Sequence, residues 1–464
     1  MTKTSRLDGF IERPRRALWQ LSVPVMAGMG LQTAYMLADM YFVGQVSAEA
    51  LAALAFNMPL VFLGLGVVFG LGTGVTAVIA RYIGARDKRL ADSSAEHAVA
   101  LGLLLSILFT AVALVWGRSL LAALGVPSSL MSLAWDYFSV IAMGYVFVVM
   151  SVFFRSILSG EGDTKTPMMI QGAGTLLNIA LDPVFIFSLG LGVKGAAWAT
   201  VISQAVPALI FVYLLFFRDH AYVNFELKNF RPSAGLFVDI FRIGAPASFS
   251  FIVIAIGGAV FNRLLIEYSE ETVAAFQVGM RIDHIVLLPI VAISASTLTL
   301  TGMFSGASRV DLIRGTVIYA LSRAIGVALA MGTLFFALAP SLVGVFSESP
   351  RITEIGTGYL RVAVFGYPFV AMVMLVGRVL QGMGQGSPMF VLSLLRVVLL
   401  SGPLAYVFVF HMHKPVEWVW LAMVGGMVAT ALLAAVWLKS ALGSGLASSV
   451  VTGRVDGLAT GRRL

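Results

Sequence analysis

The chain has 464 residues, of which 59% are hydrophobic and only 12% are charged, and its formal net charge is +8. A mean hydropathy of +0.93 lies far outside the balance of a soluble domain, so the composition excludes an ordinary soluble enzyme and predicts an all-α integral membrane protein. Roughly twelve apolar stretches are each long enough to cross ~30 Å of hydrocarbon, and the short alternating segments of a closed barrel are absent from the sequence.

The apolar stretches give the predicted elements in chain order. The expected spans cover residues 17–42, 52–80, 93–116, 133–158, 167–189, 195–217, 238–262, 273–304, 315–340, 354–378, 388–411 and 416–438. They divide the chain into five parts, namely a cytoplasmic amino-terminal segment (1–16), an amino-terminal six-helix lobe (17–217), a cytoplasmic connector (218–237), a carboxy-terminal six-helix lobe (238–440) and a cytoplasmic tail (441–464).

Positive charge predicts the orientation. Lys and Arg gather at the amino terminus, in the even-numbered loops and in the tail, whereas the odd-numbered loops are poor in both. Because short loops rich in Lys and Arg stay in the cytoplasm, both termini are expected there, in the inner membrane of a bacterium. The same bias explains the net charge, so no nucleic-acid partner is expected. The absence of cysteine excludes disulfides and thiol chemistry.

The two halves of the sequence are a repeat. A shift of 222 residues aligns Pro24 with Pro246 and Tyr137 with Tyr359, and the same offset recurs over helix after helix. Six helices per repeat is an even number, so both halves enter the membrane from the same side and are related by a pseudo-twofold axis along its normal. Such two-lobed plans favour a carrier over a channel or an enzyme.

The first span contains an acid, Asp39, at a depth where ionisable groups are costly and functional by default. Tyr35 lies one helical turn before it on the same face. Pro24, fifteen residues before Asp39, is expected to kink the helix.

The fifth span contains the second such acid. Asn178 and Asp182 are four residues apart and face the same way, Thr200 lies in the sixth span, and Tyr137 opens the fourth. Carboxylate, amide and hydroxyl oxygens suit a small hard cation, and the same carboxylates could instead carry a proton. This pattern predicts an ion-coupling site, with sodium as a possible ligand of Asp39, Asn178, Asp182 and Thr200.

Simpler explanations exist for each of these residues. The two acids would be N-terminal caps or interfacial residues if the ends of their helices lay elsewhere. Tyr137 would belong to an interfacial aromatic belt, and Thr200 would bond to its own helix.

The second half does not duplicate the acids, because Phe261 aligns with Asp39 and Gly402 with Asp182. The coupling ion is therefore expected in one lobe only. The eighth span instead carries Arg281 and Asp283, which are two residues apart and cannot pair closely on one helical face.

Each of these two side chains needs another partner, which leaves a structural bridge between helices and a second functional site as open alternatives. Arg396 in the eleventh span has no evident acid nearby, and water-filled exposure or snorkelling to headgroups explains it as well as function does.

Several motifs together resemble the multidrug and toxic compound extrusion family, in its DinF-like branch. They are Pro24, Tyr35, Asp39-Met40-Tyr41-Phe42-Val43-Gly44, Gly160-Glu161-Gly162-Asp163 before Pro167, and Asn178-x-x-x-Asp182-Pro183. The resemblance implies two six-helix lobes in a V-shaped fold, and export of lipophilic cations driven by inward movement of protons or sodium. It also implies an ion site of Asp39, Asn178, Asp182 and Thr200, a surrounding network of Tyr35 and Tyr137, and a bending point at Pro24.

The sequence thus predicts a secondary active multidrug exporter that acts as a monomer on lipophilic or cationic small molecules, with no catalytic residues and no cofactor besides the coupling ion. A lipid-linked oligosaccharide flippase would need a strongly cationic cavity, to which Arg281 and Arg396 contribute little. A membrane enzyme would need a reactive cluster, and the sequence has no metal-ligand His pair, glycine-rich nucleotide loop or nucleophile elbow. A receptor or scaffold would leave the buried acids unexplained.

Overall fold

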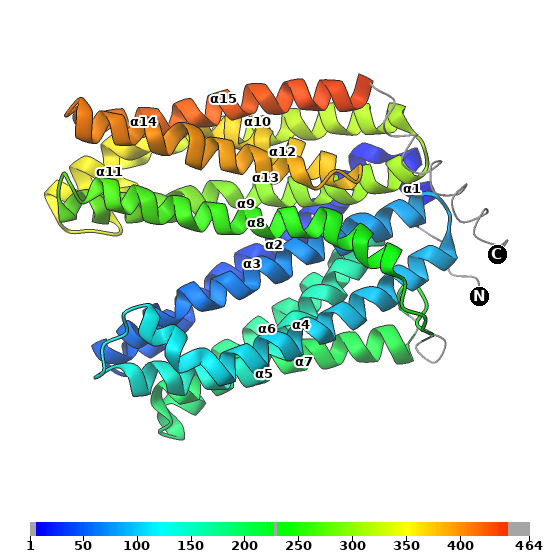
Figure 1. Ribbon diagram of the computed structural model, residues 1–464, viewed down its shortest axis with the longest axis horizontal. Helices are drawn as coiled ribbons and strands as arrows, with labels where there is room; N and C mark the ends of the chain where they lie inside the picture. The colour runs from blue at the N-terminus through cyan, green and yellow to red at the C-terminus, as the bar shows by residue number, and fades with distance from the viewer. Residues whose placement is uncertain (1–5, 219, 227–229, 444–464) are drawn as a thin grey trace. The chain divides into compact units, whose positions relative to one another are not determined.

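The computed structural model describes residues 6–218, 220–226 and 230–443, and these residues form helices and no strand. The helices (Figure 1) are α1 (Leu7–Glu12), α2 (Pro14–Gly44), α3 (Ala48–Gly84), α4 (Lys88–Ala123), α5 (Met131–Gly160), α6 (Lys165–Pro183), α7 (Gly192–Val212), α8 (Ala234–Leu265), α9 (Glu270–Gly306), α10 (Val310–Gly344), α11 (Pro350–Ala363), α12 (Tyr367–Gly382), α13 (Ser387–Leu394), α14 (Gly402–Tyr406) and α15 (Glu417–Gly443). The first five residues, part of the expected connector and the expected tail beyond Gly443 lie outside the described residues.

Twelve helical segments of the described chain are long and apolar enough to cross a membrane, which confirms the all-α membrane fold and the predicted number of spans. The short helix α1 is not among them. The tenth span joins α11 to α12 and covers Pro350–Gly382, and the eleventh joins α13 to α14 and covers Ser387–His411. Most helices extend past the expected ends because polar residues continue them beyond the hydrocarbon. Asp87, for example, caps α4 by accepting a hydrogen bond from the Leu90 amide.

Several spans contain π-helical segments, in which the backbone ladder is locally widened. In the described chain these are Val184–Ser188, Tyr213–Phe217, Leu395–Ser401 and Val407–His411. The first directly follows Pro183, which lacks the amide hydrogen that an α-helical ladder needs. Since π-helical turns often lie at functional sites, the turn at Val184–Ser188, next to Asp182, indicates that the end of α6 is a candidate functional region.

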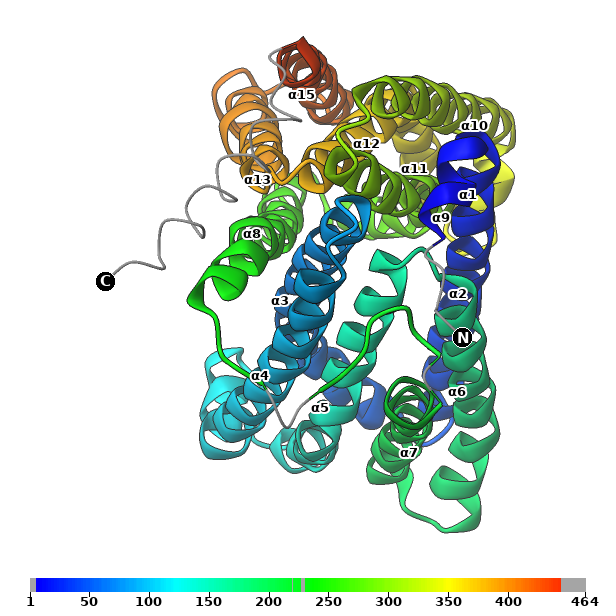
Figure 2. The same cartoon turned by 90° about the vertical axis from the view of Figure 1, so that its right-hand side faces the viewer.

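A buried helix lies at the centre of each half of the chain. In the first half α5 packs against α4 and α7, between which it lies in Figure 2, and α6 packs against α7. In the second half α9 packs against α10, α11 and α12. The membrane-spanning windows of α5 and α9 are mostly buried within the protein, whereas those of α2, α4 and α10 contain few buried residues.

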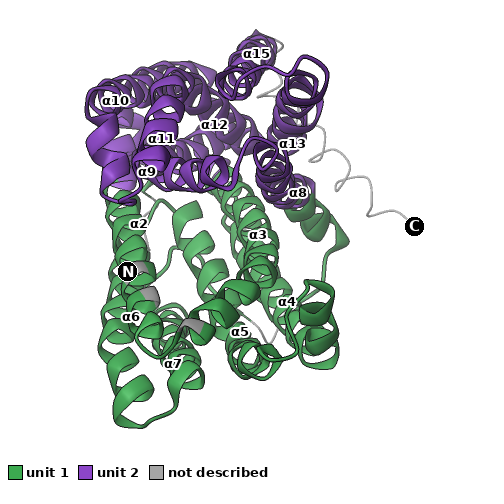
Figure 3. Ribbon diagram, turned by 90° about the vertical axis from the view of Figure 1, so that its left-hand side faces the viewer, with its two compact units in different colours: residues 1–6, 23–83, 87–241 green, residues 7–22, 84–86, 242–464 purple. Residues whose placement is uncertain are grey.

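The chain divides into two compact units (Figure 3). Unit 1 comprises residues 1–6, 23–83 and 87–241, and unit 2 comprises residues 7–22, 84–86 and 242–464. The division crosses α2 between Ser22 and Val23, directly before Pro24. The first nine residues of this helix therefore belong to unit 2, and the part that carries the first acid belongs to unit 1.

Candidate functional site

The residues predicted for ion coupling come together in unit 1. They are Tyr35 and Asp39 from α2, Tyr137 from α5, Asn178 and Asp182 from α6, and Thr200 from α7. Both carboxylates are buried, and they interact electrostatically with each other and with both tyrosines. One helix from the start of the chain and three consecutive helices of unit 1 thus contribute to one polar site.

Asn178 links α6 to α7 within this site. In the amide orientation that satisfies its neighbours, Asn178 donates a hydrogen bond to Asp182 Oδ2 at 3.0 Å. Its carbonyl oxygen faces the Thr200 amide and the Ser203 hydroxyl, both at 3.3 Å. The amide therefore orients the Asp182 carboxylate and leaves its other oxygen available.

Three buried oxygens of this site have no hydrogen-bond partner among the described residues: Asp39 Oδ1, Asp182 Oδ1 and Thr200 Oγ1. Nor does any Lys or Arg of the described chain form an ion pair with either acid. A buried polar group left unsatisfied costs about 1–3 kcal/mol, so such groups call for an explanation. Open carboxylate and hydroxyl oxygens can ligate a small hard cation, and a carboxylate can also accept a proton.

A close approach between α6 and α7 brings the amide and hydroxyl oxygens together. A Cβ atom on Gly174 would lie 2.5 Å from Pro207 Cγ and 2.8 Å from the Ser203 carbonyl oxygen, so only glycine fits at this crossing. Asn178 lies one helical turn after Gly174 and therefore reaches the backbone of α7 directly.

The simpler explanation of the two acids as N-terminal caps is wrong. Asp39 lies five residues before the C-terminal end of α2, and Asp182 lies one residue before the end of α6. Tyr137 is 6% exposed and faces the carboxylates rather than the surface. Pro24 lies inside α2, directly after the division between the two units.

In unit 2, Asp283 of α9 forms a different kind of site. Its Oδ2 accepts a hydrogen bond from the Tyr359 hydroxyl at 2.5 Å, and its Oδ1 accepts one from the Tyr367 hydroxyl at 2.6 Å. These phenols are the partners that the sequence left open. Arg281 is exposed, and Arg396 lies half-buried in the π-helical segment Leu395–Ser401.

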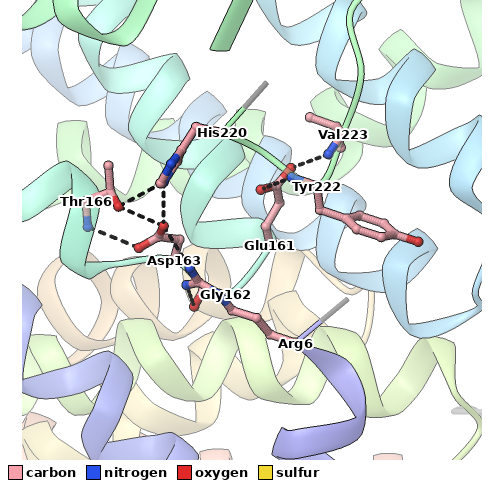
Figure 4. Close-up of polar contacts among 8 residues, drawn as sticks. All are labelled: Arg6, Glu161, Gly162, Asp163, Thr166, His220, Tyr222 and Val223. Atoms are coloured by element: carbon pink, nitrogen blue, oxygen red, sulfur yellow. Dashed lines mark hydrogen bonds and ion pairs between the residues drawn. The ribbon is translucent and has the colours of Figure 1, made fainter. Parts of the chain in front are cut away.

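A second polar cluster in unit 1 was missed by the sequence analysis (Figure 4). Directly after α5, Asp163 accepts hydrogen bonds from Arg6 at 3.0 Å and from the Thr166 amide at 3.0 Å, and it lies 3.3 Å from His220 Nε2. Burial alone would raise the pKa of Asp163, but the hydrogen bonds from Thr166 and Arg6 outweigh it and lower the pKa. Between the two acids Gly162 adopts a positive φ of 80° and accepts from Arg6 through its carbonyl oxygen.

Glu161 binds the backbone of the connector. Its two carboxylate oxygens accept hydrogen bonds from the amides of Tyr222 at 2.9 Å and Val223 at 2.7 Å (Figure 4). Burial raises the pKa of Glu161 from 4.5 to about 7, even though these amides and Arg6 favour the charged form.

Side chains of α4 continue this row of contacts. Asp92 accepts from the Asn224 amide at 2.9 Å and Glu96 from the Glu226 amide at 2.8 Å. His97 Nε2 lies 2.8 Å from the Ser233 amide. We call these acceptors, Glu161, Asp92, Glu96 and His97, the connector clasp. The sequence signal for this cluster was the Gly160-Glu161-Gly162-Asp163 motif, from which only the family resemblance was inferred and no structural role was predicted.

Twelve spans, a duplicated plan and buried acids without a cationic partner are the features of a membrane transporter. The family model described as MatE matches residues 24–184 and 246–407. The chain therefore belongs to the multidrug and toxic compound extrusion family, and its two matched ranges begin 222 residues apart, at the offset of the internal repeat.

Relatives and solved structures agree with this assignment. The chain is 26% identical over 421 residues to the probable multidrug resistance protein NorM of Thermotoga maritima, covering 89% of this chain and 90% of the relative. It is 26% identical over 400 residues to an FAD transporter of Shewanella oneidensis, covering 84% and 87%. An outward-facing structure of a multidrug resistance MATE family transporter superposes with a TM-score of 0.89 and 32% identity, over 93% of this chain and 96% of that one.

Proposed function

We propose that this protein is a secondary active multidrug exporter that exchanges lipophilic or cationic organic compounds for protons or sodium ions by alternating access. The family and the relatives described as multidrug proteins support export of small molecules. The observation that carries the coupling proposal is the pair of buried acids in unit 1, each with an oxygen that lacks a partner among the described residues.

The proposed mechanism starts from charge. A proton or sodium ion that reaches Asp39 and Asp182 offsets the repulsion between the two carboxylates, and Asn178 and Thr200 supply neutral oxygens to a bound cation. The change in charge alters the packing of α2 against α5 and α6. Pro24, which interrupts the helical ladder of α2, is the point at which this helix bends.

The energetics depend on stoichiometry. One net charge that moves inward through 100 mV supplies about 2.3 kcal/mol, enough for roughly a fiftyfold gradient of substrate. Exchange of one monovalent cation for one proton moves no net charge, and then only the concentration gradient of the ion drives export.

For Asp283 we propose a structural role, as a tie that joins α9 to α11 and α12. Both of its oxygens accept from phenols, so this carboxylate has its hydrogen bonds within the protein. The protein is further proposed to lie in the cytoplasmic membrane of a bacterium, with both termini in the cytoplasm, and to act as a monomer.

Transport into vesicles tests the proposal directly. The purified protein is reconstituted, proton and sodium gradients are imposed separately, and the movement of ethidium and other cationic dyes is followed. FAD serves as an anionic test substrate because one relative is described as an FAD transporter. Dye export that follows one of the two gradients supports the proposal. Export of FAD alone, or dye movement that neither gradient changes, would contradict it.

A further inference from the structure

A surface cavity of about 350 Å³ lies in unit 2, away from the acid site. It is lined by the side chain of Arg15 from α2 and by residues of α10, namely Gly315, Ile318, Tyr319, Ser322 and Arg323. The proposed coupling mechanism uses none of these residues. The presence of two exposed arginines, Arg15 and Arg323, in one cavity therefore requires a separate explanation.

Both guanidinium groups contact the same tyrosine. The Cζ atoms of Arg15 and Arg323 lie 5.3 Å and 5.0 Å from the centre of the Tyr319 ring. Trp19 fixes this ring by donating a hydrogen bond from Nε1 to the Tyr319 hydroxyl at 3.0 Å. Neither arginine forms an ion pair with a carboxylate of the described chain. Two like charges held at one ring repel each other, and an anion between them would replace that repulsion with attraction.

The sequence places both arginines at the same depth of the membrane. Residues 17–38 and 324–344 carry no charged side chain, and each stretch is roughly 30 Å long as a helix, which matches the hydrocarbon thickness. Arg15 lies just before the first of these stretches and Arg323 directly before the second. Both guanidinium groups therefore lie at the level of the lipid headgroups, where Trp and Tyr are also enriched.

The surroundings of the cavity suit a lipid better than a soluble anion. Ile318, on its wall, is 61% exposed and offers apolar surface beside the two cations. The guanidinium forks of Arg15 and Arg323 present donors on the polar side, and the Ser322 hydroxyl, which donates to the Tyr319 carbonyl oxygen at 2.8 Å, adds a polar group beside them. A phosphate group with an attached acyl chain matches both halves of this surface.

We propose that the cavity of Arg15, Tyr319, Ser322 and Arg323 binds the phosphate headgroup of an anionic phospholipid. The lipid bridges the start of α2 to α10 within unit 2. On the orientation given by the positive charges, this headgroup belongs to the cytoplasmic leaflet, where anionic lipids lower the surface potential. Each guanidinium donates charge-assisted hydrogen bonds to the phosphate oxygens, and the acyl chain runs along Ile318.

Native mass spectrometry of the full-length protein released from detergent micelles tests this site. Phosphatidylglycerol is titrated against the wild type, against Arg15→Gln and Arg323→Gln, and against the double variant. Each single substitution is expected to weaken retention of one phosphatidylglycerol about tenfold, and the double variant more. Arg314→Gln is the matched control, since it removes the same charge from an exposed position of α10 outside the cavity lining, and its retention should stay within about twofold of the wild type.

Two further measurements distinguish an anionic lipid from free phosphate as the ligand of the cavity. Phosphatidylcholine should be retained much less than phosphatidylglycerol, and inorganic phosphate at the same concentration should not displace the lipid. Equal retention by the wild type and both single variants would overturn the proposal, as would equal loss in the Arg314 control or displacement by inorganic phosphate. Thermal unfolding of each variant without added lipid identifies any that fail to fold, and the correctly folded single variants then decide the result.

Discussion

The acids of the two units lie in opposite environments. In unit 1, Asp39 and Asp182 each keep an oxygen without a partner among the described residues, and they lie close enough to interact. In unit 2, both oxygens of Asp283 accept hydrogen bonds from tyrosines. A carboxylate whose hydrogen bonds are complete has little to gain from a passing ion, whereas an incomplete one does.

The internal repeat makes this comparison sharper. Tyr137 and Tyr359 are repeat partners, and each lies near a carboxylate of its own unit, yet the carboxylates come from helices that are not equivalent. A tyrosine at one position of the repeat thus interacts electrostatically with two acids in unit 1 and donates a hydrogen bond to a single acid in unit 2. The difference teaches that two acids in membrane helices can differ in their hydrogen bonds, and it is on this difference that the proposed roles of coupling and structure rest.

The largest effect is expected from the acids of unit 1. Asp39→Asn and Asp182→Asn should each lower ion-driven ethidium efflux from cells by about tenfold to a hundredfold, because a neutral amide cannot exchange the ion. Expression is matched by immunoblotting. Asp311→Asn, at an exposed position of α10, is the control and should transport normally. Normal efflux by both acid variants would contradict a coupling role for Asp39 and Asp182, and with it the contrast drawn between the acids of the two units.

A loss of stability rather than of coupling is expected for Asp283→Ala. The substitution leaves two phenols without their acceptor and should lower the free energy of unfolding by about 2 kcal/mol. The midpoint of thermal unfolding in detergent measures this effect. Residual efflux of the variant should still respond to the same ion gradient, and a variant that is fully stable but uncoupled would reverse the roles assigned to the two units.

Glu161, an acid outside the membrane-spanning segments, allows a test by pH of whether a buried, hydrogen-bonded carboxylate can still take up a proton. The pKa of Glu161 in the folded protein is about 7, above its ordinary 4.5, so between these pH values the folded state holds a proton that the unfolded state releases. Stability from this group therefore falls as the pH rises from 4.5 through 7 and is constant above that. The unfolding midpoints of the wild type and Glu161→Gln should diverge over this range, by an amount equivalent to as much as about 3 kcal/mol. Parallel pH profiles of the two proteins would show that Glu161 does not titrate there.

The smallest effects are expected from the tyrosines. Tyr359→Phe and Tyr367→Phe each remove one hydrogen bond to Asp283 and should each cost about 0.6–1 kcal/mol of unfolding free energy. Tyr406→Phe, at a 50% exposed position of α14, is a suitable control. In a double-mutant cycle with Asp283→Ala, either tyrosine substitution should lose its effect once the acceptor is gone. Full additivity would mean that the tyrosines act independently of Asp283.

Much of the fold could be predicted from the sequence because hydrocarbon imposes a strict length and composition on each span. Helical spacing also predicts that Asn178 and Asp182 share one face of their helix, whereas the approach of Asp39 to them is expected only from the family resemblance. The π-helical segments could not be predicted. One of them directly follows Pro183, but proline alone does not specify how a helix adapts, and the other three are not adjacent to Pro183.

The partners of Asp283 and the connector clasp also escaped prediction. Tyr359 lies 76 residues from Asp283 along the chain, and no local spacing relates them. The clasp joins side chains to backbone amides as many as 136 residues away, at Ser233 and His97, and backbone amides carry no sequence signal. Contacts of this kind depend on how the helices pack, which hydropathy does not record.

The connector clasp has a consequence for protein engineering. The amides of Tyr222, Val223, Asn224 and Glu226 are bound by side chains of unit 1, so this stretch belongs to the first half of the molecule rather than to a neutral tether. A split version made as two co-expressed chains should therefore be cut after Glu226, which keeps the donors of Glu161, Asp92 and Glu96 in the same chain as these acceptors. A cut before Tyr222 would leave these three carboxylates without their donors, and the shorter fragment would lose part of its own fold.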